Sequence, residues 1–222
     1  DPPLGPCEFD SVRIDEVERA RAILAAAVRG RAPGARAAAV GAVGPAAPGR
    51  ELSDADFEWL MNINFWGVVH GTRAFLPHLT ASGEGHLVNV SSIFGMIGVP
   101  KQSAYNAAKF AVRGFTESLR QEMVNEGKTL GVSCVHPGGV KTNIAKMARK
   151  GASDAGRDLG AAFDKLARTT PEKAAKVILA GVRRNEARIF IGADAKAMDW
   201  MQRILGSGYQ KIIGPSYERS LK

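Results

Sequence analysis

Hydrophobic residues recur every three or four positions along a segment that begins after Ser53. The positions with this spacing are Phe57, Leu60, Met61, Asn64, Phe65 and Val68. A Ser-Asp-Ala-Asp start is typical of a helix N-terminus, so the pattern predicts a long, mostly buried helix that ends near 77–82. The same spacing predicts a second long helix over 103–125 and a shorter one, ahead of both, over 12–28.

Short continuous apolar runs predict buried strands between the helices. The three runs are 86–92, 131–136 and 188–192. Runs of this kind are typical of parallel sheets whose two faces are both covered by helices. Alternating strands and helices therefore predict an α/β fold with a doubly wound parallel sheet, whose ligands bind beyond the carboxyl ends of the strands.

The C-terminal part continues the alternation. Pro at the first helical position, in Thr170-Pro171-Glu172, predicts another helix ahead of the third strand. A terminal helix over 195–205 then precedes a tail. We interpret residues 1–222 as a single domain.

Residues 31–50 differ sharply in composition from the rest. They comprise eight Ala, four Gly, three Pro, three Arg and two Val, and the first 50 residues contain seven Arg and no Lys. We therefore distinguish an atypical low-complexity segment, 1–50, from the remainder, 51–222.

Charge and apolar content exclude several classes of protein. The formal net charge is +8, and residues 140–222 carry 17 Lys or Arg against 8 Asp or Glu. These charges are dispersed without basic runs or interleaved aromatics, so we expect a solvated surface and no nucleic-acid binding. No apolar run approaches the roughly 18–20 residues of a membrane span. The start, Asp1-Pro2-Pro3, lacks the features of a secretory signal, so we expect a cytoplasmic protein.

The two cysteines, Cys7 and Cys134, share no metal-ligand spacing with each other or with the four histidines. We expect neither a structural disulfide nor a metal site. Cys134 lies in an apolar run, where a cysteine commonly acts as a small buried hydrophobe.

Candidate chemistry begins with Tyr105 and Lys109, which lie four residues apart near the start of a predicted helix and so share one helix face. A neighbouring ammonium favours the phenolate and would lower the tyrosine pKa toward the range of a useful base. Ser92 ends a predicted strand, where its hydroxyl could contact a substrate oxygen. Asn64 lies on the preceding helix. The turn Pro137–Thr142 ends the next strand and would present backbone groups and a threonine hydroxyl to a ligand.

Together these residues resemble the short-chain dehydrogenase/reductase family, and the resemblance runs from about Leu52 to the C-terminus. The matching residues are Asn64, Ser92, Tyr105, Lys109 and the run Pro137–Thr142. The resemblance implies a Rossmann-like fold and an oxidoreductase that moves hydride between NAD or NADP and an alcohol or ketone.

Roles follow from the resemblance residue by residue. Tyr105 would be the general acid/base, and Lys109 would lower its pKa and hold the nicotinamide ribose. Ser92 would polarise the substrate carbonyl, and Asn64 would position a water in a proton relay. The residues expected at the cofactor are Tyr105, Lys109, Pro137, Gly138, Val140 and Thr142.

The family's N-terminal glycine-rich phosphate loop has no counterpart here, because Gly41, Gly44 and Gly49 have the wrong spacing. One interpretation is that the first strand-helix units are truncated or replaced; another is that residues 1–50 reflect a GC-rich coding region read in a wrong frame. The alternative to an enzyme is a non-catalytic family member that serves as a binding or oligomerisation partner. The family also implies a homodimer or homotetramer built on the helices of 53–80 and 103–125.

Overall fold

The structure is a computed structural model, and it describes residues 49, 51–83, 85–142 and 167–220. The helix expected over 12–28 and most of the low-complexity segment lie outside the described residues.

Three parallel strands form the sheet of the described chain. They are β1 (His86–Val90), β2 (Gly131–Pro137) and β3 (Arg188–Ile191), in the order β1-β2-β3. Val90 pairs with Val135, and Val135 pairs in turn with Ile189. The strands follow the three apolar runs of the sequence to within two residues. The parallel, doubly wound α/β fold is confirmed.

The long helix expected after Ser53 is present, but it is not α-helical throughout. It comprises α2 (Asp54–Met61), a π-helical turn η1 (Asn62–Trp66) and α3 (Gly67–Ala81). The Ser53 hydroxyl accepts a hydrogen bond of 3.1 Å from the Asp56 amide, which satisfies one of the free donors at the helix start. Its central turn holds Asn64.

Two further helices begin where the sequence predicts. The second long helix, α4, spans Ser103–Asn125. The helix after Thr170, α6, spans Pro171–Arg183, and the Thr170 side chain accepts a hydrogen bond of 3.3 Å from the Lys173 amide. Local capping chemistry therefore sets the start of α6.

The expected C-terminal tail is wrong. After α7 (Ala193–Leu205), which starts two residues earlier than predicted, the chain forms η4 (Gly206–Tyr209) and α8 (Gln210–Ser220). Pro215 and several glycines hide the helical pattern of this part in the sequence. Tyr209 packs with Ile97 and Val99, so contacts with a distant loop stabilise the end of the chain.

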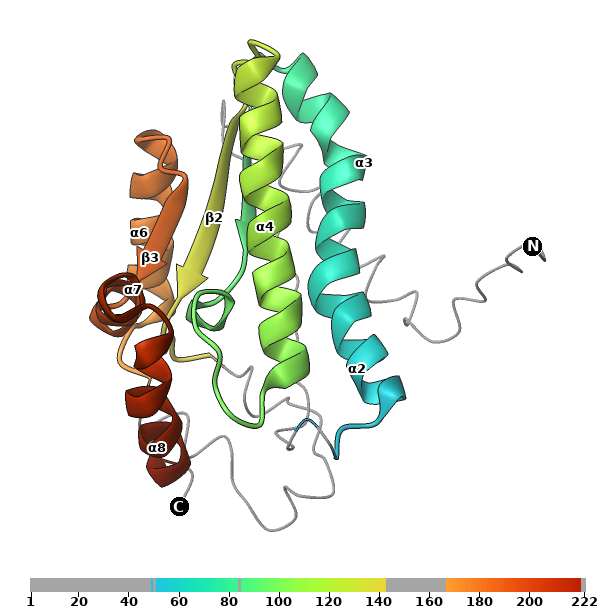
Figure 1. Cartoon of the computed structure of the whole chain (residues 1–222). Coiled ribbons are helices and arrows are strands. Elements are labelled where there is room, and N and C mark those ends of the chain that lie inside the picture. The colour runs from blue at the N-terminus through green and yellow to red at the C-terminus, as the bar shows by residue number, and fades with distance from the viewer. Residues whose placement is uncertain (1–48, 50, 84, 143–166, 221–222) are drawn as a thin grey trace, which may run out of the picture.

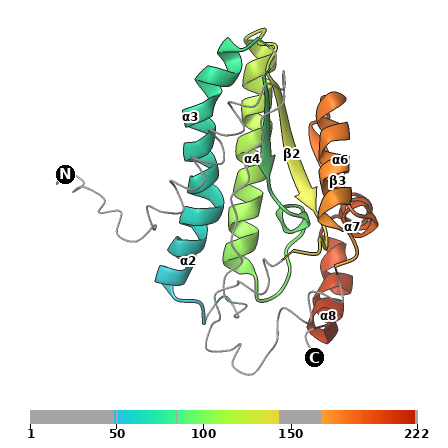
Figure 2. The same cartoon turned by 180° about the vertical axis from the view of Figure 1, so that it is seen from behind.

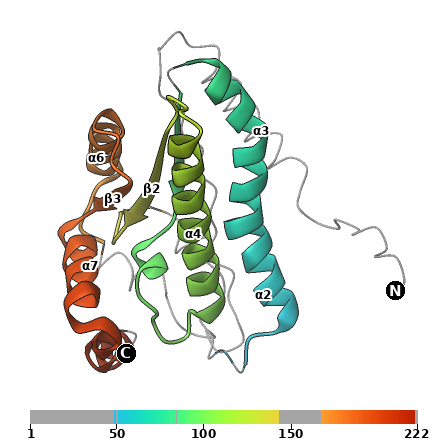
Figure 3. The same cartoon turned by 45° about the horizontal axis from the view of Figure 1, so that its top comes forward.

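Helices cover both faces of the sheet. On one face, Leu79 of α3 and Leu119 of α4 pack against Leu87 and Val132 of the strands. On the other, Ala174 of α6 belongs to a cluster built with β1, β2 and β3. In each view α4 lies between α3 and the C-terminal helices (Figure 1, Figure 2 and Figure 3).

Within the described ranges, no helix combines the length and apolar character needed to cross a membrane. The same residues contain no cluster of three or more His, Cys, Asp or Glu side chains arranged to hold a metal ion. Cys134 is a free, buried thiol, and burial raises its pKa to about 12. Cys7 lies outside the described residues.

Candidate active site

The carboxyl ends of the strands and the start of α4 lie at the same end of the molecule (Figure 1). Ser92 follows β1 and precedes the short 3-10 helix η2 (Ile93–Gly95), while Tyr105 and Lys109 belong to the first two turns of α4. Two segments that the sequence separates by a loop therefore bring the expected catalytic side chains together.

Ser92 and Tyr105 are neighbours at this site. The Ser92 side chain lies close enough to the Tyr105 phenol to lower the pKa of that phenol. The Ser92 hydroxyl also accepts a hydrogen bond of 3.1 Å from the Phe94 amide, which fixes its position at the start of η2. The Tyr105 ring packs edge-on against Phe94, with centroids 6.3 Å apart. The serine and the tyrosine thus form one preorganised pair.

Lys109 lies one helical turn below Tyr105. Its side chain is 3% exposed, and its Nζ lies 5.5 Å from the centroid of the Tyr105 ring. The same Nζ donates a hydrogen bond of 3.3 Å to the carbonyl of Val90, at the end of β1. Burial lowers the Lys109 pKa to about 8. The lysine is held against both the tyrosine and the sheet.

The expected direction of the Tyr105 pKa shift is wrong for this structure. Burial raises the pKa of the phenol to about 12, and the hydrogen bond with Ser92 offsets only part of that rise. Desolvation penalises a charged phenolate, and Lys109 is buried too, so its own charged form is weakened. Tyr105 is therefore a protonated phenol at neutral pH.

Asn64 is fully buried in η1, the π-helical turn, which packs against α4. Its Nδ2 donates a hydrogen bond of 3.1 Å to the carbonyl of Leu60 in the preceding turn. Single π-helical turns inside α-helices often mark functional sites, because they redirect one side chain without breaking the helix. The structure places Asn64 on the helix that lies beside the Tyr105 helix.

The backbone amides of Gly138 and Gly139, in the turn after β2, form hydrogen bonds within the protein. This corrects the expectation that the backbone groups of the turn are free for a ligand. The Gly138 amide donates to the carbonyl of Ile191 at 2.9 Å, and the Gly139 amide donates to Asp194 Oδ2 at 2.6 Å. Val140 forms an isolated bridge with Thr169.

Asp194, at the start of α7, explains why residue 138 of this turn is a glycine. A Cβ added at Gly138 would lie 2.2 Å from Asp194 Oδ2, a distance that real Cβ atoms do not show. At the end of the turn, Thr142 is exposed. Of the polar groups expected there, the threonine hydroxyl is the one presented to solvent.

Sequence reasoning assigned no role to Asn106, the residue after Tyr105. Its Nδ2 donates to the carbonyls of Phe94 and Ile97 at 2.7 and 2.8 Å, and its Oδ1 accepts from the Val99 amide at 3.2 Å. It therefore ties the loop that follows Ser92 to the start of α4. Only its place within the Tyr-to-Lys motif could have drawn attention to it.

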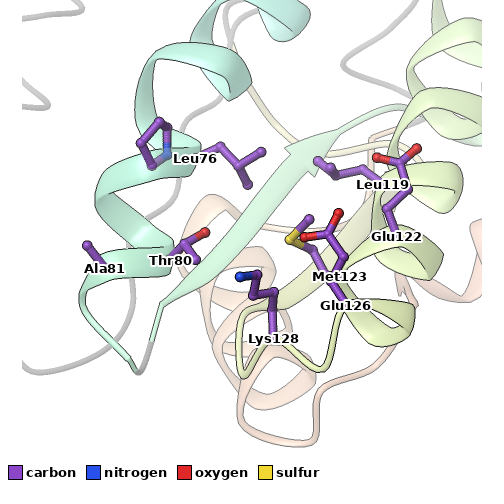
Figure 4. A pocket seen from close by; sticks show the side chains of 9 residues that line it. Leu76, Thr80, Ala81, Leu119, Glu122, Met123, Glu126 and Lys128 are labelled. Carbon is purple, nitrogen blue, oxygen red and sulfur yellow. The ribbon is translucent and has the colours of Figure 1, made fainter.

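A groove of about 510 Å³ lies between the C-terminal ends of α3 and α4. Figure 4 shows its lining side chains, among them Leu76 and Thr80 from α3 and Leu119 and Met123 from α4. Tyr105 begins α4, whereas this groove lies toward the other end of that helix. The groove contains none of the expected site residues, so it is not the candidate active site.

Tyr105 and Lys109 provide a hydroxyl and an ammonium on one helix face, and such groups could donate to neighbouring ribose hydroxyls of a dinucleotide. The turn from Pro137 to Thr142 lies at the carboxyl end of β2, where ligands of doubly wound sheets bind.

This fold, with a serine, a tyrosine and a lysine gathered at the carboxyl ends of its strands, defines a Rossmann-like α/β protein of the oxidoreductase type. The family model described as short chain dehydrogenase matches residues 36–153, and the chain belongs to that family. The match begins ahead of Leu52, where the resemblance starts in the sequence, and so includes the end of the low-complexity segment.

Two named relatives are also oxidoreductases by name. SadH of Mycobacterium tuberculosis, an oxidoreductase by its name, is 54% identical over 159 residues, which are 71% of this chain and 58% of SadH. YxnA of Bacillus subtilis, also named an oxidoreductase, is 37% identical over 144 residues, which are 64% of this chain and 39% of YxnA. The chain thus spans little more than half the length of SadH, its more similar relative.

Solved structures show the same fold. A short-chain dehydrogenase/reductase of Burkholderia phymatum, in complex with NAD, has a TM-score of 0.67 at 24% identity, covering 78% of this chain and 66% of that one. A short-chain dehydrogenase of Burkholderia cenocepacia, in complex with NADP, has a TM-score of 0.67 at 22% identity, covering 94% and 80%.

Proposed function

We propose that this chain carries the catalytic part of an NAD- or NADP-linked oxidoreductase that interconverts an alcohol and a ketone. The observation that carries the proposal is that the Ser92 hydroxyl and the Tyr105 phenol are neighbours, with Lys109 Nζ 5.5 Å from the centroid of the Tyr105 ring. Such a pair serves proton exchange with one substrate oxygen, because a neutral phenol donates and a hydroxyl polarises.

Tyr105 acts as the acid in the direction of reduction. Because burial raises its pKa to about 12, the phenol keeps its proton at neutral pH and donates it to the substrate oxygen. Ser92 donates a hydrogen bond to the same oxygen and stabilises the charge that develops there. In the direction of oxidation the phenolate takes the proton, and Lys109 lies close enough to stabilise it.

The cofactor, NAD or NADP, supplies the hydride when bound. Tyr105 and Lys109 hold its nicotinamide ribose, while Pro137, Gly138, Val140 and Thr142 line its nicotinamide end. Support for both cofactors comes from the two Burkholderia proteins, one solved with NAD and the other with NADP. Asn64 holds a water that links Lys109 to solvent.

The substrate is a small alcohol or ketone, and the assembly is a homodimer or homotetramer. The outer surfaces of the long helices support such an assembly, since Trp66 is 43% exposed and Phe110 is 40% exposed.

Titration of the purified chain with NADH and NADPH, followed by tryptophan quenching, tests the proposal. We expect saturable binding that Lys109→Ala weakens, and reduction of a ketone panel that Tyr105→Phe lowers by about 10²–10⁴-fold without loss of folding. Absence of binding at millimolar cofactor would instead favour a non-catalytic family member that acts as a binding or oligomerisation partner.

A further inference from the structure

His136 is a polar side chain in the core, one residue before the Pro-Gly turn. Its side chain is fully buried, and its ring stacks on Phe190 of β3 with centroids 5.3 Å apart and planes 25° apart. Nothing in the proposed proton exchange uses this imidazole directly. A buried imidazole with no stated task therefore lies directly beneath the proposed active site.

The hydrogen bonds of His136 determine its tautomer. Nδ1 lies 3.0 Å from the carbonyl oxygen of Ser92, and because a carbonyl only accepts, Nδ1 carries the proton. Burial lowers the pKa of the ring to about 4, so the imidazole is neutral at neutral pH. Nε2 is then an acceptor, and it is buried with no hydrogen-bond partner among the described residues.

An unsatisfied buried acceptor destabilises a protein. A phenylalanine ring would fill nearly the same space, keep the stack on Phe190 and leave no bare acceptor. Packing and stability alone would therefore favour an apolar ring at this position. What the histidine supplies, and an apolar ring cannot, is the Nδ1–H donated to Ser92.

That hydrogen bond acts on the residue that holds the tyrosine. The Ser92 carbonyl accepts from His136 and also from the Gly95 amide at 3.0 Å, so both of its lone pairs are used. The preceding residue, Ser91, donates its hydroxyl to the carbonyl of Lys109 at 2.8 Å. The Ser91 hydrogen bond thus holds residues 91–92 against α4, and the His136 hydrogen bond holds them against β2.

We infer that His136 is a positioning residue for the proposed reaction: its Nδ1–H holds the Ser92 backbone so that the serine hydroxyl keeps its place beside the Tyr105 phenol. The inference rests on the proposed function. Without the hydrogen bond, the Gly95 amide alone holds the Ser92 carbonyl, and the peptide plane and the hydroxyl of that residue can shift together. Proton exchange is sensitive to such displacement.

Two variants separate positioning from packing. His136→Phe keeps a ring but removes the donor, and His136→Asn keeps an N–H close to the place of Nδ1 but removes the ring. We expect His136→Phe to lower kcat at least tenfold with an unchanged KM for cofactor and an equal or higher Tm. We expect His136→Asn to restore most of kcat at a lower Tm. A kcat that follows Tm across both variants would overturn the inference.

A second measurement does not need activity. With tyrosine labelled at ¹³Cζ, the Tyr105 resonance reports the hydrogen bond from Ser92, and Ser92→Ala gives the reference shift. We expect His136→Phe to move the resonance in the same direction as Ser92→Ala, and His136→Asn to leave it in place.

The activity assays and the ¹³Cζ shift test different claims. If the parent chain neither binds cofactor nor reduces ketones, the proposed function fails, while the ¹³Cζ shift still decides the role of His136. A resonance that ignores His136→Phe but responds to Ser92→Ala would overturn the positioning role. A resonance that ignores Ser92→Ala would remove the contact on which that role depends.

Discussion

The Nζ of Lys109 lies 5.5 Å from the ring centroid of Tyr105 and donates to the carbonyl of Val90 at 3.3 Å. One ammonium therefore contacts both the proposed acid and the end of β1. Its burial has a consequence for stability that can be measured apart from catalysis.

The burial of Lys109 makes the free energy of unfolding depend on pH in the alkaline range. Burial lowers its pKa from 10.5 to about 8, so between these values the unfolded chain binds more protons than the folded one. Stability then rises with pH across this window, by about 3 kcal/mol for this group if each pKa unit is worth 1.36 kcal/mol.

Urea unfolding of the parent and of Lys109→Met at pH 7, 8, 9 and 10 isolates this contribution. The raised pKa values of Tyr105 and Cys134, both about 12, act in the opposite direction but are common to the two chains. The parent should gain stability relative to the variant as pH rises. Parallel pH profiles would contradict a depressed lysine pKa.

Removing the Asn106 side chain should destabilise the loop that follows Ser92. Asn106→Ala leaves the Val99 amide and the carbonyls of Phe94 and Ile97 without their present partner. We expect the free energy of unfolding to fall by about 2–3 kcal/mol. Ser118→Ala, an exposed position on the same helix, is the matched control and should change it by less than about 0.5 kcal/mol. Equal effects would show that Asn106 does not fasten the loop.

A methyl group at Gly138 should disturb the turn after β2. The added Cβ would meet Asp194 and displace the carboxylate that accepts from the Gly139 amide. We expect Gly138→Ala to lower Tm and to weaken cofactor binding about tenfold, or about 1.4 kcal/mol. Thermal unfolding and the NADH titration measure both effects.

A double variant, Gly138→Ala with Asp194→Ala, tests whether the clash with Asp194 causes the losses expected for Gly138→Ala. Because the clash lies between these two residues, the combined loss should be smaller than the sum of the single losses. Gly114→Ala, where a Cβ meets nothing within 4 Å, is the control and should stabilise α4 by up to about 1 kcal/mol. Strictly additive losses would argue against the contact.

The packing of the segment around Tyr209 should depend on the hydroxyl of that residue. Tyr209 Oη accepts a hydrogen bond of 2.8 Å from the Gly98 amide, which belongs to the loop between Ser92 and α4. Tyr209→Phe should lower the free energy of unfolding by about 1 kcal/mol and speed hydrogen exchange at Gly98. Unchanged exchange at that amide would show that the hydroxyl does not restrain the loop.

Features with a local cause could be read from the sequence. Ser53 and Thr170 cap their helices through hydrogen bonds within three residues, and the helices begin where they indicate. The spacing of Tyr105 and Lys109 places both on one helix face, and the structure keeps them together. Local propensity and periodicity suffice here because the interacting groups are close in the chain.

Features with a distant cause needed the tertiary structure. The α8 helix follows a glycine-containing segment and has Pro215 within it, and Tyr209 is anchored to a loop more than a hundred residues away. The carboxylate of Asp194 leaves no room for a side chain at position 138. His136 contacts Ser92 only because β1 and β2 lie side by side. The Tyr105 pKa rises although its sequence neighbour suggested a fall, because desolvation depends on everything packed around the phenol. The order of elements and the residues of the candidate site could be predicted from the sequence, whereas burial and long-range hydrogen bonds exist only once the chain is folded.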